Sequence, residues 1–123
     1  QMIIEVEKGK REKITVGNLE PVLDLIDVRD TINALWTLAE KGTYGEAYNI
    51  CSSKGRKLKD VLDMMISLSG KDIEIEVDKK KFRPLDDPIF IGDNSKLKNL
   101  GWEPKIELEE SLKDTLDYWR TFS

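Results

Sequence analysis

The chain has 123 residues, with 20 Lys and Arg, 24 Asp and Glu and no His, so its formal net charge is −4. This length supports one compact domain, and the 39% of apolar residues can form its core, which argues against a disordered chain. No apolar run approaches the roughly 20 residues that span a bilayer, so we expect no membrane association. The lack of His excludes catalytic triads built on imidazole. A single Cys cannot form an intrachain disulfide and fits a cytoplasmic protein.

The helices are predicted from apolar residues spaced by three and four and from residues that favour helix ends. Asp30 is expected to cap a helix from Thr31 to Lys41 that packs through one apolar face. That face consists of Ile32, Leu35, Trp36 and Ala39. Further helices are predicted over residues 1–8, 58–68, 93–97 and 108–119, and the last of them carries an apolar seam of Leu108, Leu112, Leu116 and Trp119. Gly9 and Gly70 are expected to end two of them, because glycine tolerates the left-handed conformation found there.

Strands are predicted where short apolar runs are bounded by turn residues. They cover residues 14–16, 46–51, 73–78 and 89–91, and the segment from Leu19 to Arg29 is expected to be extended. In residues 73–78 apolar and acidic side chains alternate, which indicates one packed and one solvent-exposed face. The alternation of helices and strands predicts one α/β unit (an α+β fragment) over residues 1–123, with a small mixed sheet and about four helices.

Several common binding motifs are absent from the sequence. The nearest approach to a dinucleotide-binding turn, Gly42-Thr43-Tyr44-Gly45, lacks the further glycine and follows a predicted helix instead of a strand. Basic clusters at residues 8–13, 54–57 and 79–83 have no interleaved aromatic residues and belong to an acidic chain, so we expect solvated surface and no nucleic-acid partner. We also expect no metal site, because the commonest metal ligand is missing.

Three stretches together resemble the C-terminal portion of a known enzyme family. They are Val16–Glu20 with Asp27–Asp30, Phe82–Pro88, and Gly92–Leu97 with Leu100–Pro104 and the closing Asp117–Arg120. In this order and spacing they are similar to extended short-chain dehydrogenase/reductases that act on nucleotide sugars, from about Met2 to Arg120. The Gly-Asn-Leu-Glu and Arg-Pro-x-Asp pieces are most similar to the GDP-mannose 4,6-dehydratase branch, which includes GDP-4-keto-6-deoxymannose reductases.

The resemblance implies the C-terminal lobe of an extended Rossmann-type enzyme. The family places its NADP (or NAD) site and its catalytic Ser/Thr, Tyr and Lys in an N-terminal Rossmann domain. No Tyr of this chain is followed by Lys four residues later. We therefore expect no catalytic or cofactor-binding residue here, and we interpret the chain, which begins with Gln1, as an inactive fragment.

In the parent enzyme, as the resemblance implies, NADP oxidises the hexose of GDP-mannose at C4, water leaves across C5–C6, and the hydride returns at C6. A reductase relative would deliver one hydride to the 4-keto group, and other nucleotide-sugar epimerases or dehydratases are further alternatives. An alternative of another class is a stand-alone, non-catalytic binding or interaction module. The expected partners are a GDP-sugar and the chain's own N-terminal Rossmann domain.

The resemblance also implies a set of substrate-binding residues. Arg83 is expected to bind the diphosphate, because a guanidinium presents a fixed fork of donors to phosphate oxygens. Asp86 is expected either to accept hydrogen bonds from ribose hydroxyls or to cap a turn. Asn18 is expected either to contact the nucleotide or to shape its turn. Leu19 and Glu20 are expected to line the same place.

Two features of the sequence qualify this interpretation. Many relatives carry a phosphate-binding Arg immediately before the residue that matches Asp24, and this chain has Leu23 there. Either Arg83 carries more of the anion binding or the substrate differs. The segment Tyr48-Asn49-Ile50 resembles a strand at the edge of the family's nucleotide-binding sheet. Without that sheet its backbone lacks partners, so we predict a homo-oligomer.

Overall fold

Two small sheets and five α-helices make up the part of the chain that the computed structural model describes, residues 1–83 and 88–122. The helices are α1 (Met2–Glu7), α2 (Val28–Lys41), α3 (Leu58–Ser69), the 3₁₀ helix η1 (Lys79–Lys81), α4 (Ser95–Lys98) and α5 (Leu108–Phe122). The strands are β1 (Lys13–Val16), β2 (Val22–Asp24), β3 (Gly55–Lys57), β4 (Glu74–Val77) and β5 (Ile89–Phe90). The predicted mixed α/β class is confirmed.

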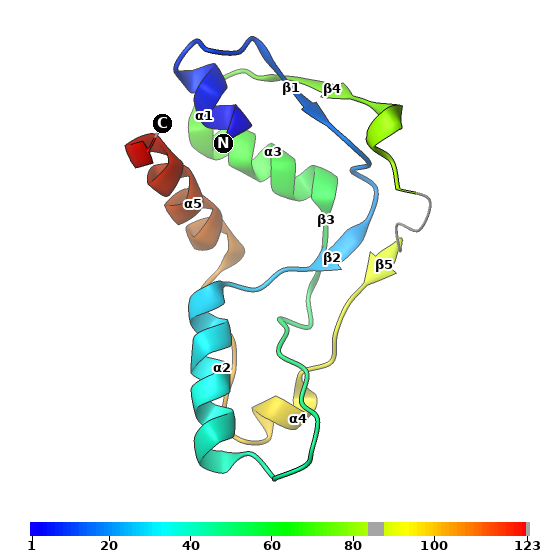
Figure 1. The fold of residues 1–123 in the computed structure, drawn as a ribbon, viewed down its shortest axis with the longest axis vertical. Coiled ribbons are helices and arrows are strands. Elements are labelled where there is room, and N and C mark those ends of the chain that lie inside the picture. Colours follow the sequence, from blue (N-terminus) through cyan, green and yellow to red (C-terminus); the bar gives the residue numbers. More distant parts are fainter. Residues whose placement is uncertain (84–87, 123) are drawn as a thin grey trace.

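The two sheets differ in strand direction and position. β1 and β4 form a parallel pair, whereas β2 lies between antiparallel β3 and parallel β5. Figure 1 shows α1, α3 and α5 at the same end of the molecule as the β1–β4 pair, and α2 and α4 at the opposite end. The three-stranded sheet lies between these two ends.

Each end of the molecule has its own hydrophobic cluster. The first joins Ile4 of α1, Ile14 of β1, Ile73 before β4 and Leu116 of α5, with Trp119 packed against it. This arrangement confirms that Leu116 and Trp119 belong to the packed face of the last helix. The second cluster joins residues of α2, α4 and the segment after α4, namely Ala34, Leu97 and Trp102.

The start of α2 differs from the prediction. Asp27, not Asp30, caps the helix, because Asp27 Oδ1 accepts the Arg29 amide at 2.8 Å. The prediction for Asp30 is wrong because its buried carboxylate has other partners, the backbone amides of Lys105 and Ile106 at 3.1 and 2.9 Å. Asp30 therefore holds the segment that leads into α5 against the first turn of α2.

The predicted packing face of α2 is also wrong. Ile32, Leu35 and Trp36 are 59%, 55% and 68% exposed, whereas Asp30 and Ala34 on another side of the helix are buried. The helix contacts Leu97 and Trp102 through the side that carries Ala34. The apolar periodicity correctly identifies residues that share a face, but in this structure no described residue covers that face enough to bury it.

Residues 46–51, predicted as a strand, belong to neither sheet. The side chains of Tyr48 and Ile50 pack against the cluster of Ala34, yet no backbone hydrogen bond within the described ranges connects residues 47–50 to another segment. A strand is defined by pairing, so an apolar, extended sequence alone does not make one. Conversely, β3 is an unpredicted strand that pairs with β2.

Glycine ends three helices in two different ways. Gly9 and Gly70 have φ values of 69° and 67°, which confirms their predicted left-handed conformation. Gly42, after α2, has a φ of −66°, and a Cβ there would lie 2.5 Å from the Leu38 carbonyl oxygen. At this position glycine is required by close approach of the backbone and not by a positive φ.

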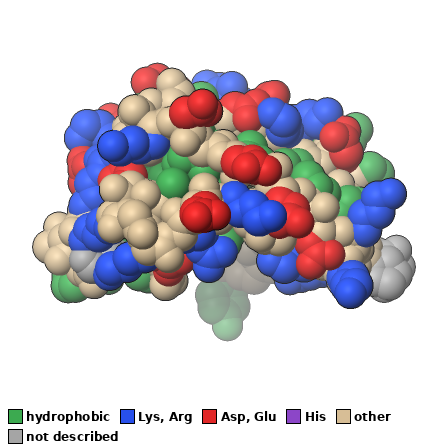
Figure 2. All heavy atoms as spheres, turned by 90° about the horizontal axis from the view of Figure 1, so that it is seen from above, with side chains coloured by type: hydrophobic (Ala, Val, Ile, Leu, Met, Phe, Trp, Pro, Cys, Tyr) green, Lys and Arg blue, Asp and Glu red, His purple; other side chains and the backbone are tan. Residues whose placement is uncertain are grey.

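The surface carries both signs of charge. Figure 2 shows acidic and basic side chains intermixed over one face of the molecule. Residues of the basic clusters form ion pairs, among them Lys13 with Glu76 and Lys57 with Glu20, both at 2.8 Å. Within residues 1–83 and 88–122, no helix has the length and apolar character that crossing a membrane requires.

Candidate functional site

The residues singled out by the resemblance lie on two connectors. The first connector, residues 17–21, leads from β1 to β2 and carries Asn18, Leu19 and Glu20; the second, residues 78–88, leads from β4 to β5. β1 is parallel to β4, and β2 is parallel to β5. The two connectors therefore begin at the same edge of the β1–β4 pair. They also end at the same edge of the β2–β5 pair. Arg83 lies on the second connector, and Asp86 falls outside the described residues.

Backbone contacts fasten the connectors to one another. Where they begin, the Asp78 amide donates to the Val16 carbonyl oxygen at 2.8 Å, and Lys81 Nζ donates to Thr15 O at 3.1 Å. A Cβ on Gly17 would lie 3.2 Å from the Lys81 carbonyl oxygen, so these two backbones pack closely. Asn18 follows this contact directly, and Arg83 follows it by two residues.

The connectors are also held together where they end. The Val22 amide donates to the Pro88 carbonyl oxygen at 2.9 Å. The connectors are thus hydrogen-bonded to one another both where they leave the first sheet and where they enter the second. The tertiary structure thus brings together two stretches that are about 65 residues apart in the sequence, which is what a shared binding site requires.

The polar groups of the first connector mainly shape the connector itself. Asn18 Oδ1 accepts the Glu20 amide at 3.0 Å, which closes a turn. The Glu20 carboxylate lies 2.8 Å from Lys57 Nζ, and this pairing raises the pKa of Lys57. Leu19 O accepts the Lys59 amide at 3.0 Å. Asn18 Nδ2 has no partner among the described residues and is the group of Asn18 available to a ligand.

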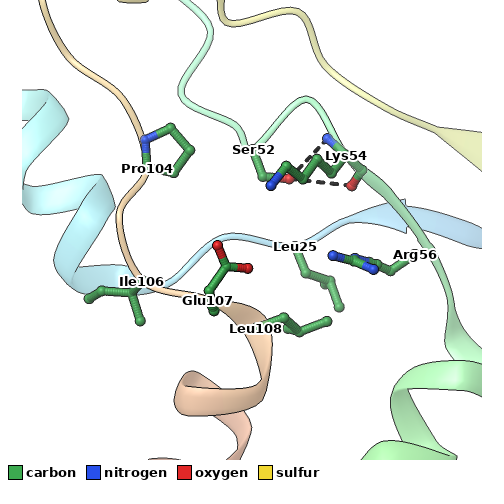
Figure 3. Close-up of a pocket in the computed structure, with 8 residues that line it drawn as sticks. All are labelled: Leu25, Ser52, Lys54, Arg56, Pro104, Ile106, Glu107 and Leu108. Atoms are coloured by element: carbon green, nitrogen blue, oxygen red, sulfur yellow. Dashed lines mark hydrogen bonds between the residues drawn. The ribbon is translucent and has the colours of Figure 1, made fainter.

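Arg83 is an exposed cation that follows η1 and Phe82. Within the described part of the chain no carboxylate lies within ion-pairing distance of its guanidinium. It does not line the pocket shown in Figure 3. Its place beside the first connector, and the absence of a carboxylate partner among residues 1–83 and 88–122, suit it to bind an anion that enters from solvent.

A small pocket lies on the other side of β2, between the β2–β3 pair and the start of α5 (Figure 3). Its volume is about 40 Å³, and its polar lining includes Ser52, Lys54, Arg56 and Glu107. The apolar lining is Leu25, Pro104, Ile106 and Leu108. From the sequence, Lys54 and Arg56 are expected to be solvated residues of a basic cluster. The pairing of β3 with β2 brings them to a concave surface, and the sequence pattern does not reveal that pairing.

The Asp24 carboxylate organises the loop beside this pocket. Its Oδ1 accepts the Ser52 amide at 2.8 Å and the Ser52 hydroxyl at 2.5 Å, and its Oδ2 accepts the Ser53 and Gly92 amides at 2.9 and 3.2 Å. Asp24 therefore connects the end of β2 to the turn before β3 and to the segment after β5.

The residues present do not fit a nicotinamide dinucleotide. The Gly42–Gly45 turn follows α2 instead of a strand, and its Thr43 amide donates to the Tyr48 hydroxyl oxygen at 2.9 Å, so it is closed on its own side chains. The described residues also hold no group of three or more His, Cys, Asp or Glu side chains suited to a metal ion. The polar side chains of the connectors and of the pocket can bind and orient a ligand.

Comparison with known proteins identifies one family for most of the chain. The model of the GDP-mannose 4,6 dehydratase family matches residues 1–115. A GDP-6-deoxy-D-mannose reductase of Pseudomonas aeruginosa is 25% identical over 123 residues, which cover 98% of this chain and 40% of that protein. GDP-mannose 4,6 dehydratase 1 of Arabidopsis thaliana is 29% identical over 116 residues, which cover 91% of this chain and 32% of that protein.

A solved structure shares almost the whole fold. The structure of RMD from Pseudomonas aeruginosa complexed with NADPH superposes with a TM-score of 0.93 at 25% identity. The match covers 99% of this chain and 41% of that one. The chain therefore spans well under half the length of the relatives it matches here.

Proposed function

Because the chain belongs to the GDP-mannose 4,6 dehydratase family, we propose that it is the substrate-binding lobe of a nucleotide-sugar enzyme and binds GDP-mannose through its diphosphate. The observation that carries this proposal is the pair of adjacent connectors, which brings Asn18 and Arg83 to one edge of the molecule. The exposed guanidinium of Arg83 has no carboxylate partner among the described residues, and its fork of donors matches phosphate oxygens.

The proposed division of labour leaves chemistry to another part of the parent enzyme. An N-terminal Rossmann domain would supply the nicotinamide dinucleotide and the catalytic groups, in line with the greater length of the relatives and with the NADPH in the related structure. The lobe described above would contribute binding energy and orientation of the hexose. Alone, the chain is expected to leave GDP-mannose unchanged, whereas the parent would form GDP-4-keto-6-deoxymannose.

A reductase is the second candidate within the family. The similarity to the Pseudomonas aeruginosa reductase extends over 98% of the chain and favours it. A lobe that binds the diphosphate serves both activities, so the two candidates separate only in the parent. Formation of a 4-keto product from GDP-mannose would identify a dehydratase, and oxidation of NADPH by the 4-keto sugar nucleotide would identify a reductase.

Isothermal titration of the 123-residue chain with GDP-mannose tests the binding proposal directly. Arg83→Gln is expected to weaken binding by about tenfold or more, which corresponds to about 1.4 kcal/mol. The matched control is Arg11→Gln, because Arg11 lies between α1 and β1, outside both connectors, and pairs with Glu5. Equal affinities of both variants would overturn the role of Arg83. A wild-type chain that binds no GDP-mannose would instead favour a stand-alone module of another kind.

A further inference from the structure

We propose that the pocket between β3 and the start of α5 binds a phosphoryl oxyanion through Arg56 and Lys54. This inference rests on the proposed function, since the anion would be part of the same sugar nucleotide. It assigns the ligand a second arginine, Arg56, on a different strand from the connectors that carry Asn18 and Arg83.

The sheet register fixes the position of Arg56 relative to β2. In the antiparallel β2–β3 pair, Arg56 lies directly opposite Leu23. Side chains of directly opposed residues project from the same face of a sheet. Leu23 is apolar and offers Arg56 no counter-charge.

The loop that presents Arg56 is held in place before any ligand arrives. The Asp24 carboxylate accepts four hydrogen bonds, which fix the turn at Ser52 and Ser53 and the backbone at Gly92. The Lys54 amide donates to Ser52 Oγ at 3.1 Å, which continues the turn into β3. At Gly55 a Cβ would lie 2.5 Å from Ile91 Cδ1 and 2.8 Å from Val22 Cγ1, so glycine allows β3 to approach β2 closely.

The charges that face the pocket favour an anion. Figure 3 shows the side chains of Lys54 and Arg56 extending over the pocket from the β3 side, with the Glu107 carboxylate across from them. Neither cation has an acidic partner among the described residues. Two positive charges, on Lys54 and Arg56, face the one carboxylate of the described chain that lines the pocket, that of Glu107, and leave the lining net positive. The Glu107 carboxylate repels an anion in the pocket. Removal of its charge should therefore strengthen binding, whereas removal of the Arg56 charge should weaken it.

The size of the pocket limits the ligand group it can take. Its volume of about 40 Å³ is far below the roughly 300–1,000 Å³ of pockets that enclose whole small molecules. It can admit the oxygens of one phosphoryl group while the remainder of the ligand lies outside. A diphosphate, whose two phosphoryl groups are covalently joined, is therefore a suitable chemical class.

Titration of the 123-residue chain with GDP, and separately with inorganic pyrophosphate, tests the proposal. Arg56→Gln is expected to weaken binding of both probes by about tenfold. Arg56→Lys, which keeps the charge but loses the fork, is expected to lie between this variant and the wild type. Glu107→Gln is expected to strengthen binding severalfold, a gain that a purely structural role for these residues would not produce. Arg11→Gln is the control for the loss of one arginine charge.

The outcomes separate this inference from the proposed function. If Arg83→Gln weakens GDP binding while Arg56→Gln and Glu107→Gln leave it unchanged, the pocket proposal is overturned and the lobe remains a nucleotide-sugar site. If the wild-type chain binds neither GDP nor pyrophosphate, both proposals are overturned. Circular dichroism and thermal melts of each variant establish that the fold is retained, as expected for Arg56, which is exposed.

Discussion

The side chains of Asp27 and Arg29 form two parallel hydrogen bonds, with Arg29 Nε 2.9 Å from Asp27 Oδ1 and Nη2 2.9 Å from Oδ2. The same guanidinium lies 2.8 Å from Asp114 Oδ2 on α5. This geometry ties the N-terminal cap of α2 to α5. The hydrogen bonds from Arg29 hold the pKa of Asp27 well below its usual range, and the pairing raises the pKa of Arg29.

Asp27→Asn is expected to destabilise the chain by about 1–2 kcal/mol at pH 7, since Asn can still cap α2 but lacks the negative charge that pairs with the Arg29 guanidinium. Because the pKa of Asp27 is lower in the folded chain than in the unfolded chain, its stabilising contribution is complete above the unfolded value of roughly 3.9 and is lost as the pH falls below it. Urea denaturation at pH 7 and pH 3 should therefore show a smaller difference between mutant and wild type at pH 3. Asp114→Asn, at a more exposed partner, is the control, and a difference independent of pH would contradict the assignment.

Asp24→Ala is expected to destabilise the chain by about 2 kcal/mol, because the Ser52, Ser53 and Gly92 amides lose their acceptor. Urea denaturation gives the free energy of unfolding. Asp63→Ala removes a carboxylate that pairs with Lys59 on the exposed side of α3, and it should change stability by less than about 0.5 kcal/mol. Similar effects of the two substitutions would show that the Asp24 carboxylate does not organise its loop.

Substitutions of Trp36 and Trp102 are expected to have very different effects on the free energy of unfolding. Trp36→Gln is expected to leave the stability of this chain within about 0.5 kcal/mol of the wild type, because Trp36 is 68% exposed. Trp102→Ala should cost about 3–5 kcal/mol, because Trp102 is 5% exposed and its Nε1 donates to the Asp30 carbonyl oxygen at 3.2 Å. Thermal and urea denaturation compare them. A large loss on Trp36→Gln would mean that the face of α2 is covered in solution.

We also predict that the chain self-associates. Residues 47–50 make no backbone–backbone hydrogen bond to another segment in the described part of the chain, and Ile32, Leu35 and Trp36 expose apolar surface on α2. Analytical ultracentrifugation at increasing concentration should show a dimer or larger species. Asn49→Pro removes one amide donor while favouring an extended Tyr48, so it should weaken association without unfolding the chain. A monomer at high concentration would contradict the prediction.

Sequence alone was sufficient where the determinant is local. Gly9 and Gly70 end helices because their own φ values are positive, and the seam that ends in Leu116 and Trp119 follows from a spacing of three and four residues. The motif pieces around Asn18 and Arg83 were likewise sufficient for the family, which the match over residues 1–115 confirms. Each of these signals lies within a few consecutive residues.

Only the tertiary structure decided what each surface meets. Periodicity groups Ile32, Leu35 and Trp36 on one face of α2, but burial depends on a neighbour, and the neighbour lies against Ala34 instead. Residues 46–51 have the composition of a strand, yet a strand needs hydrogen bonds from a distant segment. The same holds for function: parallel pairing of β1 with β4 and of β2 with β5 brings Asn18 and Arg83 to one edge, and the β2–β3 register sets Arg56 opposite Leu23. Contacts between distant segments decide these features, and no local pattern in the chain encodes them.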